Sequence, residues 1–142
     1  MNSIDIKKEQ GTYVYVPLVN SNQLREFYKK QGLIVQPDLH CTIACSKKYF
    51  NHTINKEEII VSSIKLKEIT TLRDERNVVI TFDSPVLQKR FRDCMNEGAN
   101  YEFESYIPHI SLTYDGFKDY KKLRLPNFGL VFDGEKVETL KE

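Results

Sequence analysis

The chain has 142 residues, with 21 Lys and Arg against 20 Asp and Glu, so its formal charge is only +1. This length is typical of one domain, and we expect residues 1–142 to form one. Duplex-DNA-binding proteins usually carry a large positive excess, so we expect no such partner. No apolar run approaches the roughly 20 residues that a membrane span needs, and the polar first ten residues lack a signal peptide's apolar core. The sequence therefore predicts a cytoplasmic protein with no membrane partner and with three reduced cysteines.

Strands are predicted wherever β-branched and apolar residues gather between turn residues. These segments are 12–19, 39–46, 58–69, 77–83, 101–105, 107–115 and 129–139, the last as a strand or a hairpin. Two helices are predicted between them, over 23–31 and from Pro85 to just before Gly98. Ser21 or Asn22 is expected to cap the first helix, and Ser84 the second. This order favours an α+β fold with a largely antiparallel sheet.

Two tripeptides stand out, each a histidine followed by any residue and then a hydroxyl residue. Residues 39–45 read LHCTIAC and residues 107–113 read IPHISLT, so His40 and Thr42 match His109 and Ser111 across 69 positions. Side chains at i and i+2 of a strand share a face, so each histidine shares a face with its hydroxyl partner. Strands placed side by side would present two imidazoles and two hydroxyls to one site.

This set of groups suits phosphodiester cleavage. One imidazole can take a proton from the attacking hydroxyl while the other gives one to the leaving oxygen, and such help is worth about 10²–10⁴-fold. The hydroxyls can donate hydrogen bonds to the phosphate oxygens, where charge accumulates. The residues alone do not say which histidine is the base and which is the acid.

These residues have other interpretations. A single such tripeptide is common by chance, whereas two of them in equivalent strand settings are less easily explained by chance. No cluster at metal-ligand spacing is visible, so we expect no metal site. The remaining histidine, His52, is predicted to lie in a surface loop, and residues 51–57 are a candidate lid.

The paired tripeptides resemble the signature of the two-histidine (2H) phosphoesterase superfamily. This resemblance implies two pseudo-symmetric α+β lobes around a central cleft, with one motif on a central strand of each. Sequence segments that flank the two motifs narrow this resemblance further. From about residue 11 onward, the chain is similar to phage anti-CBASS phosphodiesterases. The segments are GTYV at 11–14, PDLHCT at 37–42, PHISLTY at 108–114 and LVFDGE at 130–135.

The narrower resemblance implies a metal-independent enzyme without other cofactors. Such proteins degrade the cyclic di- and trinucleotides, cGAMP and its relatives, that bacteria make as alarm signals on infection. It also implies immune evasion in the cytoplasm of an infected bacterium, while leaving the oligomeric state open. The catalytic roles fall on His40, Thr42, His109 and Ser111.

The resemblance further implies that aromatic residues and a carboxylate near the C-terminus grip the nucleobases. Tyr13 and then Tyr106 are the aromatic candidates, and Glu135 or Glu138 is the candidate carboxylate. The chain has no Trp, so any stacking surface must come from other residues.

Two rival functions remain open. An RNA-end phosphodiesterase would open nucleoside 2′,3′-cyclic phosphates and ignore cGAMP. A non-catalytic sponge would bind a cyclic nucleotide and release it intact, but it would need no matched pair of histidines.

Overall fold

The structure is a computed structural model that describes residues 10–101 and 105–140. Its strands are β1 (Thr12–Pro17), β2 (His40–Ser46), β3 (Ile59–Val61), β4 (Leu66–Leu72), β5 (Asp74–Phe82), β6 (His109–Thr113), β7 (Leu130–Phe132) and β8 (Lys136–Thr139). Its helices are α2 (Ser21–Lys29) and α3 (Pro85–Asn96), with short 3₁₀ turns at Ser63–Lys65 and Tyr120–Lys122. No helix in these two ranges is long and apolar enough to cross a membrane.

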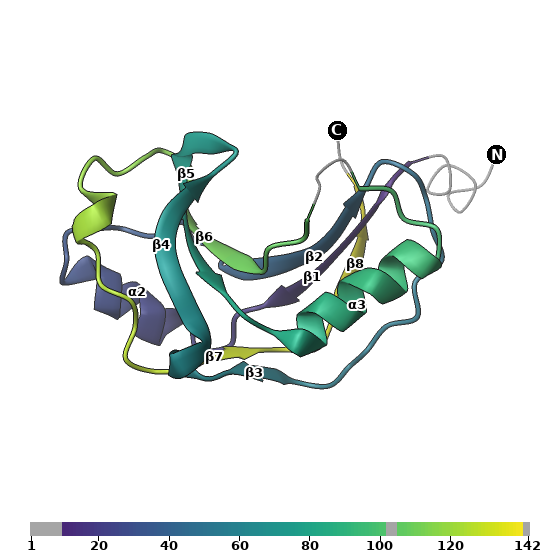
Figure 1. The fold of residues 1–142 in the computed structure, drawn as a ribbon, viewed down its shortest axis with the longest axis horizontal. Coiled ribbons are helices and arrows are strands. Elements are labelled where there is room, and N and C mark those ends of the chain that lie inside the picture. The colour runs from purple at the N-terminus through teal and green to yellow at the C-terminus, as the bar shows by residue number, and fades with distance from the viewer. Residues whose placement is uncertain (1–9, 102–104, 141–142) are drawn as a thin grey trace.

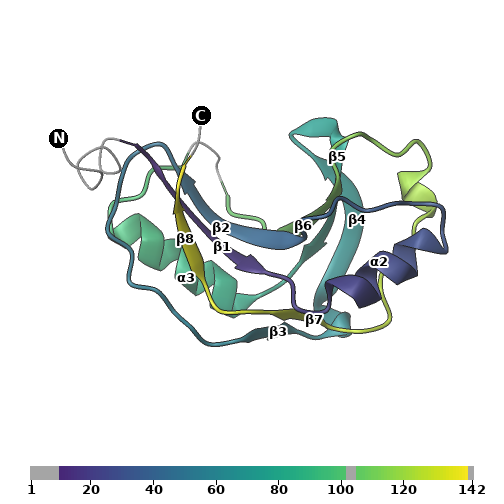
Figure 2. The same cartoon turned by 180° about the vertical axis from the view of Figure 1, so that it is seen from behind.

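The strands form two three-stranded sheets, ordered β2-β1-β8 and β4-β5-β6, and a two-stranded sheet of β3 and β7. Every pairing is antiparallel, which confirms the α+β class with largely antiparallel sheets. Figures 1 and 2 show the two larger sheets at opposite ends of the molecule, with α3 beside the first and α2 at the end that holds the second. Strands β2 and β6 are the edges at which these two sheets meet.

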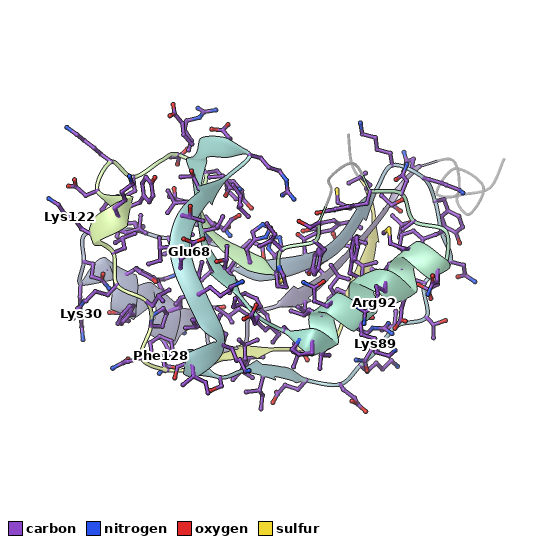
Figure 3. The ribbon with its side chains drawn as sticks, viewed as in Figure 1. Lys30, Glu68, Lys89, Arg92, Lys122 and Phe128 are labelled. Atoms are coloured by element: carbon purple, nitrogen blue, oxygen red, sulfur yellow. The ribbon has the colours of Figure 1, made fainter. Side chains whose placement is uncertain are left out.

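A shared hydrophobic core lies beneath the sheets and holds the two motif strands in place. Alternate residues of β1 are buried, including Val14 and Val16, while the residues between them face the other side. Helix α3 contributes Leu87 and Cys94 to the core, and Figure 3 shows Lys89 and Arg92 on its exposed surface. Each fully buried large apolar side chain stabilises the fold by about 1.5–3 kcal/mol, so this core keeps the strands rigid.

The start of α3 follows the prediction closely. Ser84 Oγ accepts a hydrogen bond from the Leu87 backbone N–H at 3.2 Å, and Pro85 occupies the first turn. The start of α2 does not follow it. Asn20 precedes this helix without a side-chain cap, and the Ser21 hydroxyl donates backward to the Leu18 carbonyl.

Two predicted strands need correction. Segment 58–69 is divided by the 3₁₀ turn at 63–65, because Ile64 lies on the surface, 84% exposed, instead of continuing a buried face. Segment 129–139 is not a hairpin, since β7 pairs with β3 whereas β8 pairs with β1. Part of segment 101–105 lies outside the described residues.

Candidate active site

The two motif strands touch although they belong to different sheets. The Gln36 backbone N–H donates to the Leu112 carbonyl at 2.7 Å, and its side-chain amide donates to the Ser111 carbonyl at 3.1 Å. The Cys41 thiol hydrogen-bonds to the backbone of His109. Motifs that are 69 residues apart in the sequence therefore lie next to each other in the fold.

Each motif strand carries a β-bulge at the same place. The pairing register skips one residue directly after the motif hydroxyl, namely Ile43 after Thr42 in β2 and Leu112 after Ser111 in β6. A bulge bends its strand and changes the face that the following side chains take. In β2 this turns Cys45 toward the same cavity as Thr42.

Both motif imidazoles are oriented in the same way. Nδ1 of His40 lies 2.9 Å from the Asp38 carbonyl, and Nδ1 of His109 lies 2.7 Å from the Ile107 carbonyl, in each case two residues earlier. A carbonyl oxygen can only accept a hydrogen bond, so Nδ1 carries the proton in both rings. This tautomer leaves Nε2 as the atom that exchanges protons with a substrate.

The charged surroundings of the two rings differ. Burial lowers the pKa of His109, and the positive charges of Arg73 and His40 lower it further, against the opposing bond to the Ile107 carbonyl. His109 is therefore held in its neutral form. His40 instead has the Asp38 carboxylate 3.9 Å from its Nδ1.

Tyr13, on the neighbouring strand β1, reaches into the first motif. Its hydroxyl lies 2.7 Å from His40 Nε2 and 2.8 Å from Thr42 Oγ1. Burial is the main reason that the pKa of Tyr13 lies well above its usual value, so the phenol stays protonated. Its ring stacks on Tyr15 at 5.1 Å between centroids. The predicted aromatic residue thus contacts the motif through its hydroxyl.

One cavity of about 350 Å³ gathers all four motif side chains and Tyr13. It lies between the two larger sheets, and its wall extends to the tip of the β4–β5 hairpin and to the segment that follows α3. Other residues that line it include Lys47, Arg73, Asn77, Tyr101, Tyr106 and Tyr114. Cavities of this size with a few convergent polar groups commonly bind small ligands.

Tyr106 also lines the cavity, but as a fixed part of its wall. It is 9% exposed, its ring stacks on Phe91 at 4.6 Å, and its hydroxyl donates to the Thr42 carbonyl at 2.6 Å. Tyr106 therefore supports the strand that carries the first motif.

The two C-terminal carboxylates lie outside the residues that line the cavity. Glu138 is exposed on β8, where it accepts a hydrogen bond from the Tyr15 hydroxyl at 2.8 Å. Glu135 has a fully buried side chain, and its oxygens accept from Arg90 and from the Asn55 backbone. The structure thus places neither carboxylate in the cavity, where the sequence suggested contact with a nucleobase. Strand β8 pairs with β1, and the turn before β8 packs under α3.

His52 corrects a second expectation, because its side chain is completely buried and does not lie on the surface. Its Nδ1 lies 2.6 Å from Glu97 Oε1 and its Nε2 lies 2.7 Å from Glu135 Oε1. Carboxylates accept on both sides, so the ring is a doubly protonated imidazolium. Thr53 and Asn55 donate backbone hydrogen bonds to the same two carboxylates. Residues 51–57 are therefore anchored away from the cavity and do not form a lid over it.

The pKa values of this buried cluster reflect mutual stabilisation. Burial lowers the pKa of His52, but hydrogen bonds to Cys94, Glu135 and Glu97 outweigh burial and raise it to about 10. Burial raises the pKa of Glu135, but hydrogen bonds from Arg90, His52 and the Asn55 backbone lower it to about 2. The cluster is charged and paired at neutral pH.

His52, Cys94 and Glu97 also bring potential metal-ligand atoms within 4.8 Å of one another. These residue types bind zinc in other proteins. Here His52 Nδ1 already hydrogen-bonds to Glu97, and Cys94 Sγ lies 3.6 Å from the same nitrogen. The sequence does not reveal this cluster, because its members come from a loop, from α3 and from the residue after α3 with no recognisable spacing.

A comparison with protein families matches residues 10–142 to the family described as "Anti-CBASS protein Acb1". The match covers the whole described part of the chain, including both motifs.

Individual relatives carry the same description. The protein of Acinetobacter phage Ac42 is 27% identical over 138 residues, which cover 93% of this chain and 92% of the relative. That of Yersinia phage phiR1-RT is 29% identical over 119 residues, covering 83% and 77%. That of Caulobacter sp. (strain RHG1) is 27% identical over 146 residues, covering 95% of this chain but only 23% of that longer relative.

Proposed function

The chain belongs to the anti-CBASS protein Acb1 family, and on this premise we propose that it is a metal-independent phosphodiesterase of the two-histidine type. Its substrates are the cyclic di- and trinucleotides of bacterial immune signalling, such as cGAMP, and it cleaves their 3′–5′ bonds in the cytoplasm of the infected cell. The observation that carries this proposal is the convergence of two imidazoles and two hydroxyls on one cavity.

His109 is the general base in this reaction. Its Nδ1–H is bound to the Ile107 carbonyl, so the lone pair on Nε2 is available, and its lowered pKa keeps that lone pair unprotonated. Nε2 takes the proton of the ribose 2′-hydroxyl next to the scissile bond. The 2′-oxygen then forms a bond to phosphorus.

His40 is the general acid. The Asp38 carboxylate lies 3.9 Å from its Nδ1, and its Nε2 lies 2.7 Å from the Tyr13 hydroxyl. When the bond from phosphorus to the 5′-oxygen breaks, His40 Nε2 gives its proton to that oxygen. The products are a linear nucleotide with a 2′,3′-cyclic phosphate end, a protonated His109 and a neutral His40, so atoms and charges balance.

The hydroxyls of Thr42 and Ser111 bind the non-bridging phosphate oxygens. Both sit two residues after a catalytic imidazole and line the same cavity. Donors that are already in place when charge develops on the phosphate stabilise the transition state without reorganisation.

The local correspondence between β2 and β6 supports placement in the two-histidine superfamily. Both strands have an imidazole held through Nδ1 by the carbonyl two residues earlier, and both have a bulge directly after the hydroxyl residue. Two pseudo-symmetric lobes, one around each motif strand, would account for this repetition.

The test is turnover of cGAMP in the presence of EDTA, with the products separated by chromatography. Wild-type protein should yield linear product, whereas His40→Gln and His109→Gln should lose at least about 10²-fold in kcat. Glu138→Gln, an exposed change outside the cavity, is the matched control and should retain activity. Unchanged turnover in both histidine variants would refute the proposal.

The same assay separates the rival functions. Cleavage of a nucleoside 2′,3′-cyclic phosphate without cleavage of cGAMP would identify an RNA-end phosphodiesterase. Recovery of intact cGAMP from a stoichiometric complex would identify a sponge.

A further inference from the structure

Arg73 forms the tip of the β4–β5 hairpin, between Leu72 and Asp74, which pair with each other. Its backbone has φ 65°, the left-handed conformation that glycine and asparagine adopt more easily than arginine. Non-glycine residues in strained conformations concentrate at functional sites. The hairpin thus keeps a long cationic side chain where a turn-forming residue would be easier to accommodate.

The hairpin bends so that its tip comes back over the motif strands. Thr81 of β5 pairs with His109, and β5 begins seven residues earlier at Asp74, a separation of about 23 Å along a straight strand. Arg73 nevertheless lines the same cavity as His109 and acts electrostatically on it. Figures 1 and 2 show the curvature of β4 and β5 that brings the tip over the concave side.

Neighbouring side chains fix the position of Arg73. Its Nη2 donates to the Tyr101 hydroxyl at 3.3 Å, and this bond joins the hairpin to the segment that follows α3. Asn77 Nδ2 donates to the Leu72 carbonyl at 3.4 Å and so supports the backbone just before Arg73. Both Tyr101 and Asn77 line the cavity.

The proposed substrate carries a second negative charge that needs a binding residue. A cyclic dinucleotide carries two phosphates, and the four motif side chains of His40, Thr42, His109 and Ser111 serve the one that is cleaved. Resting on the proposed function, we propose that Arg73 binds the phosphate that is not cleaved. The guanidinium presents a planar fork of donors that matches two phosphate oxygens.

Lys47 is the other residue with a permanently cationic side chain among the described residues that line the cavity. It follows β2, and its backbone N–H donates to Asn100 Oδ1 at 3.0 Å, so it belongs to the opposite wall. Arg73 is the better choice because its guanidinium can bind a phosphate with two parallel hydrogen bonds.

The test compares two substrates that share the scissile bond but differ in phosphate number. Cyclic GMP-AMP has two phosphates, whereas the linear dinucleotide GpA has one. We expect Arg73→Gln to raise KM for cyclic GMP-AMP by about 10- to 100-fold, the usual effect of a charge-assisted hydrogen bond, with a much smaller change in kcat. With GpA, measured at a pH well above the acid limb of His109, both constants should stay within about twofold of wild type.

Arg76→Gln is the matched control, because Arg76 lies on the same hairpin with an exposed side chain outside the cavity lining. This variant should leave kcat and KM unchanged for both substrates. Arg73→Gly, which suits the positive φ, should reproduce the Arg73→Gln result with an unchanged melting temperature. An unchanged KM for cyclic GMP-AMP would overturn the proposal. An equal rise in KM for GpA would also overturn it, because it would place Arg73 on the scissile phosphate.

Equilibrium binding distinguishes a failure of this inference from a failure of the proposed function. If wild-type protein binds cyclic GMP-AMP but cleaves neither substrate, the proposed reaction is wrong, and the role of Arg73 is decided by Kd. A Kd weakened at least tenfold in Arg73→Gln supports the phosphate contact, and an unchanged Kd refutes it. If wild-type protein does not bind cyclic GMP-AMP at all, both proposals fall.

Discussion

The hydroxyl of Tyr13 lies 2.7 Å from His40 Nε2 and 2.8 Å from Thr42 Oγ1, so it joins the imidazole and the hydroxyl of one motif. Because Tyr13 lies on β1 and the motif lies on β2, the pairing of these two strands sets this geometry. Tyr13 is therefore well placed to hold His40 in the orientation that proton transfer requires.

Removing that hydroxyl should affect the rate more than the binding of substrate. Tyr13→Phe keeps the ring but loses a hydrogen bond worth about 0.5–1.5 kcal/mol, so we expect kcat to fall by about 3- to 10-fold. Tyr15→Phe is the matched control, because the Tyr15 hydroxyl bonds to Glu138 outside the motif. Steady-state kinetics on cGAMP will separate kcat from KM. Equal kcat values for the two variants would show that the Tyr13 hydroxyl does not contribute to the proposed mechanism.

The pH dependence of kcat/KM should report the surroundings of His109. A base must be neutral, and a lowered pKa keeps His109 neutral below its ordinary value of 6.5, so the acid limb should lie below pH 6.5. Arg73→Gln removes a positive charge that lowers this pKa, so the limb should move to higher pH. Titration of the His109 ring by NMR measures the same pKa independently. An acid limb that stays in place would show that Arg73 does not act on His109.

The buried cluster around His52 should matter for stability and not for catalysis. His52→Ala removes the imidazolium that pairs with both Glu97 and Glu135, and breaking such a buried pair costs about 3–5 kcal/mol. Lys89→Ala removes an exposed pair with Asp93 and should cost no more than about 1 kcal/mol. Urea unfolding measures both free energies. A loss below 1 kcal/mol in His52→Ala would mean that this cluster does not stabilise the fold.

The same cluster should give its largest contribution to stability between about pH 4.5 and 6.5. The pKa of Glu135 falls from 4.5 to about 2, so its contribution is complete above pH 4.5 and disappears as the pH falls toward 2. The pKa of His52 rises from 6.5 to about 10, so its contribution is complete below pH 6.5 and is lost as the pH rises through 10. The unfolding free energies of wild type and His52→Gln should therefore differ most near pH 5.5. A larger difference at pH 9.5 would contradict this assignment of charges.

The sequence predicted the local geometry of the motifs well, because strand alternation depends only on neighbouring residues. His40 and Thr42 line one cavity with His109 and Ser111, as the spacing of two residues required. The two bulges were not predicted, since nothing in the run after Thr42 distinguishes a regular strand from one with an extra residue.

Long-range features were harder to predict. The place of Arg73 in the cavity wall could not be predicted, because residues 72–74 contain no glycine or asparagine to mark the tight turn. The two carboxylates that bind His52 come from the residue after α3 and from the turn before β8, and no spacing in the sequence connects them. The resemblance makes Glu135 or Glu138 a candidate for binding a nucleobase, whereas the fold directs the Glu135 carboxylate to Arg90.

The proposed mechanism makes His40 and His109 a single proton-transfer unit, and a double-mutant cycle measures that directly. Turnover of cGAMP should be compared for wild type, His40→Gln, His109→Gln and the double variant, all in EDTA. Residues that act as a unit are strongly non-additive, so the double variant should be about as slow as the slower single variant. A double variant slower by the product of the two single losses would show that the histidines act independently and would contradict the account.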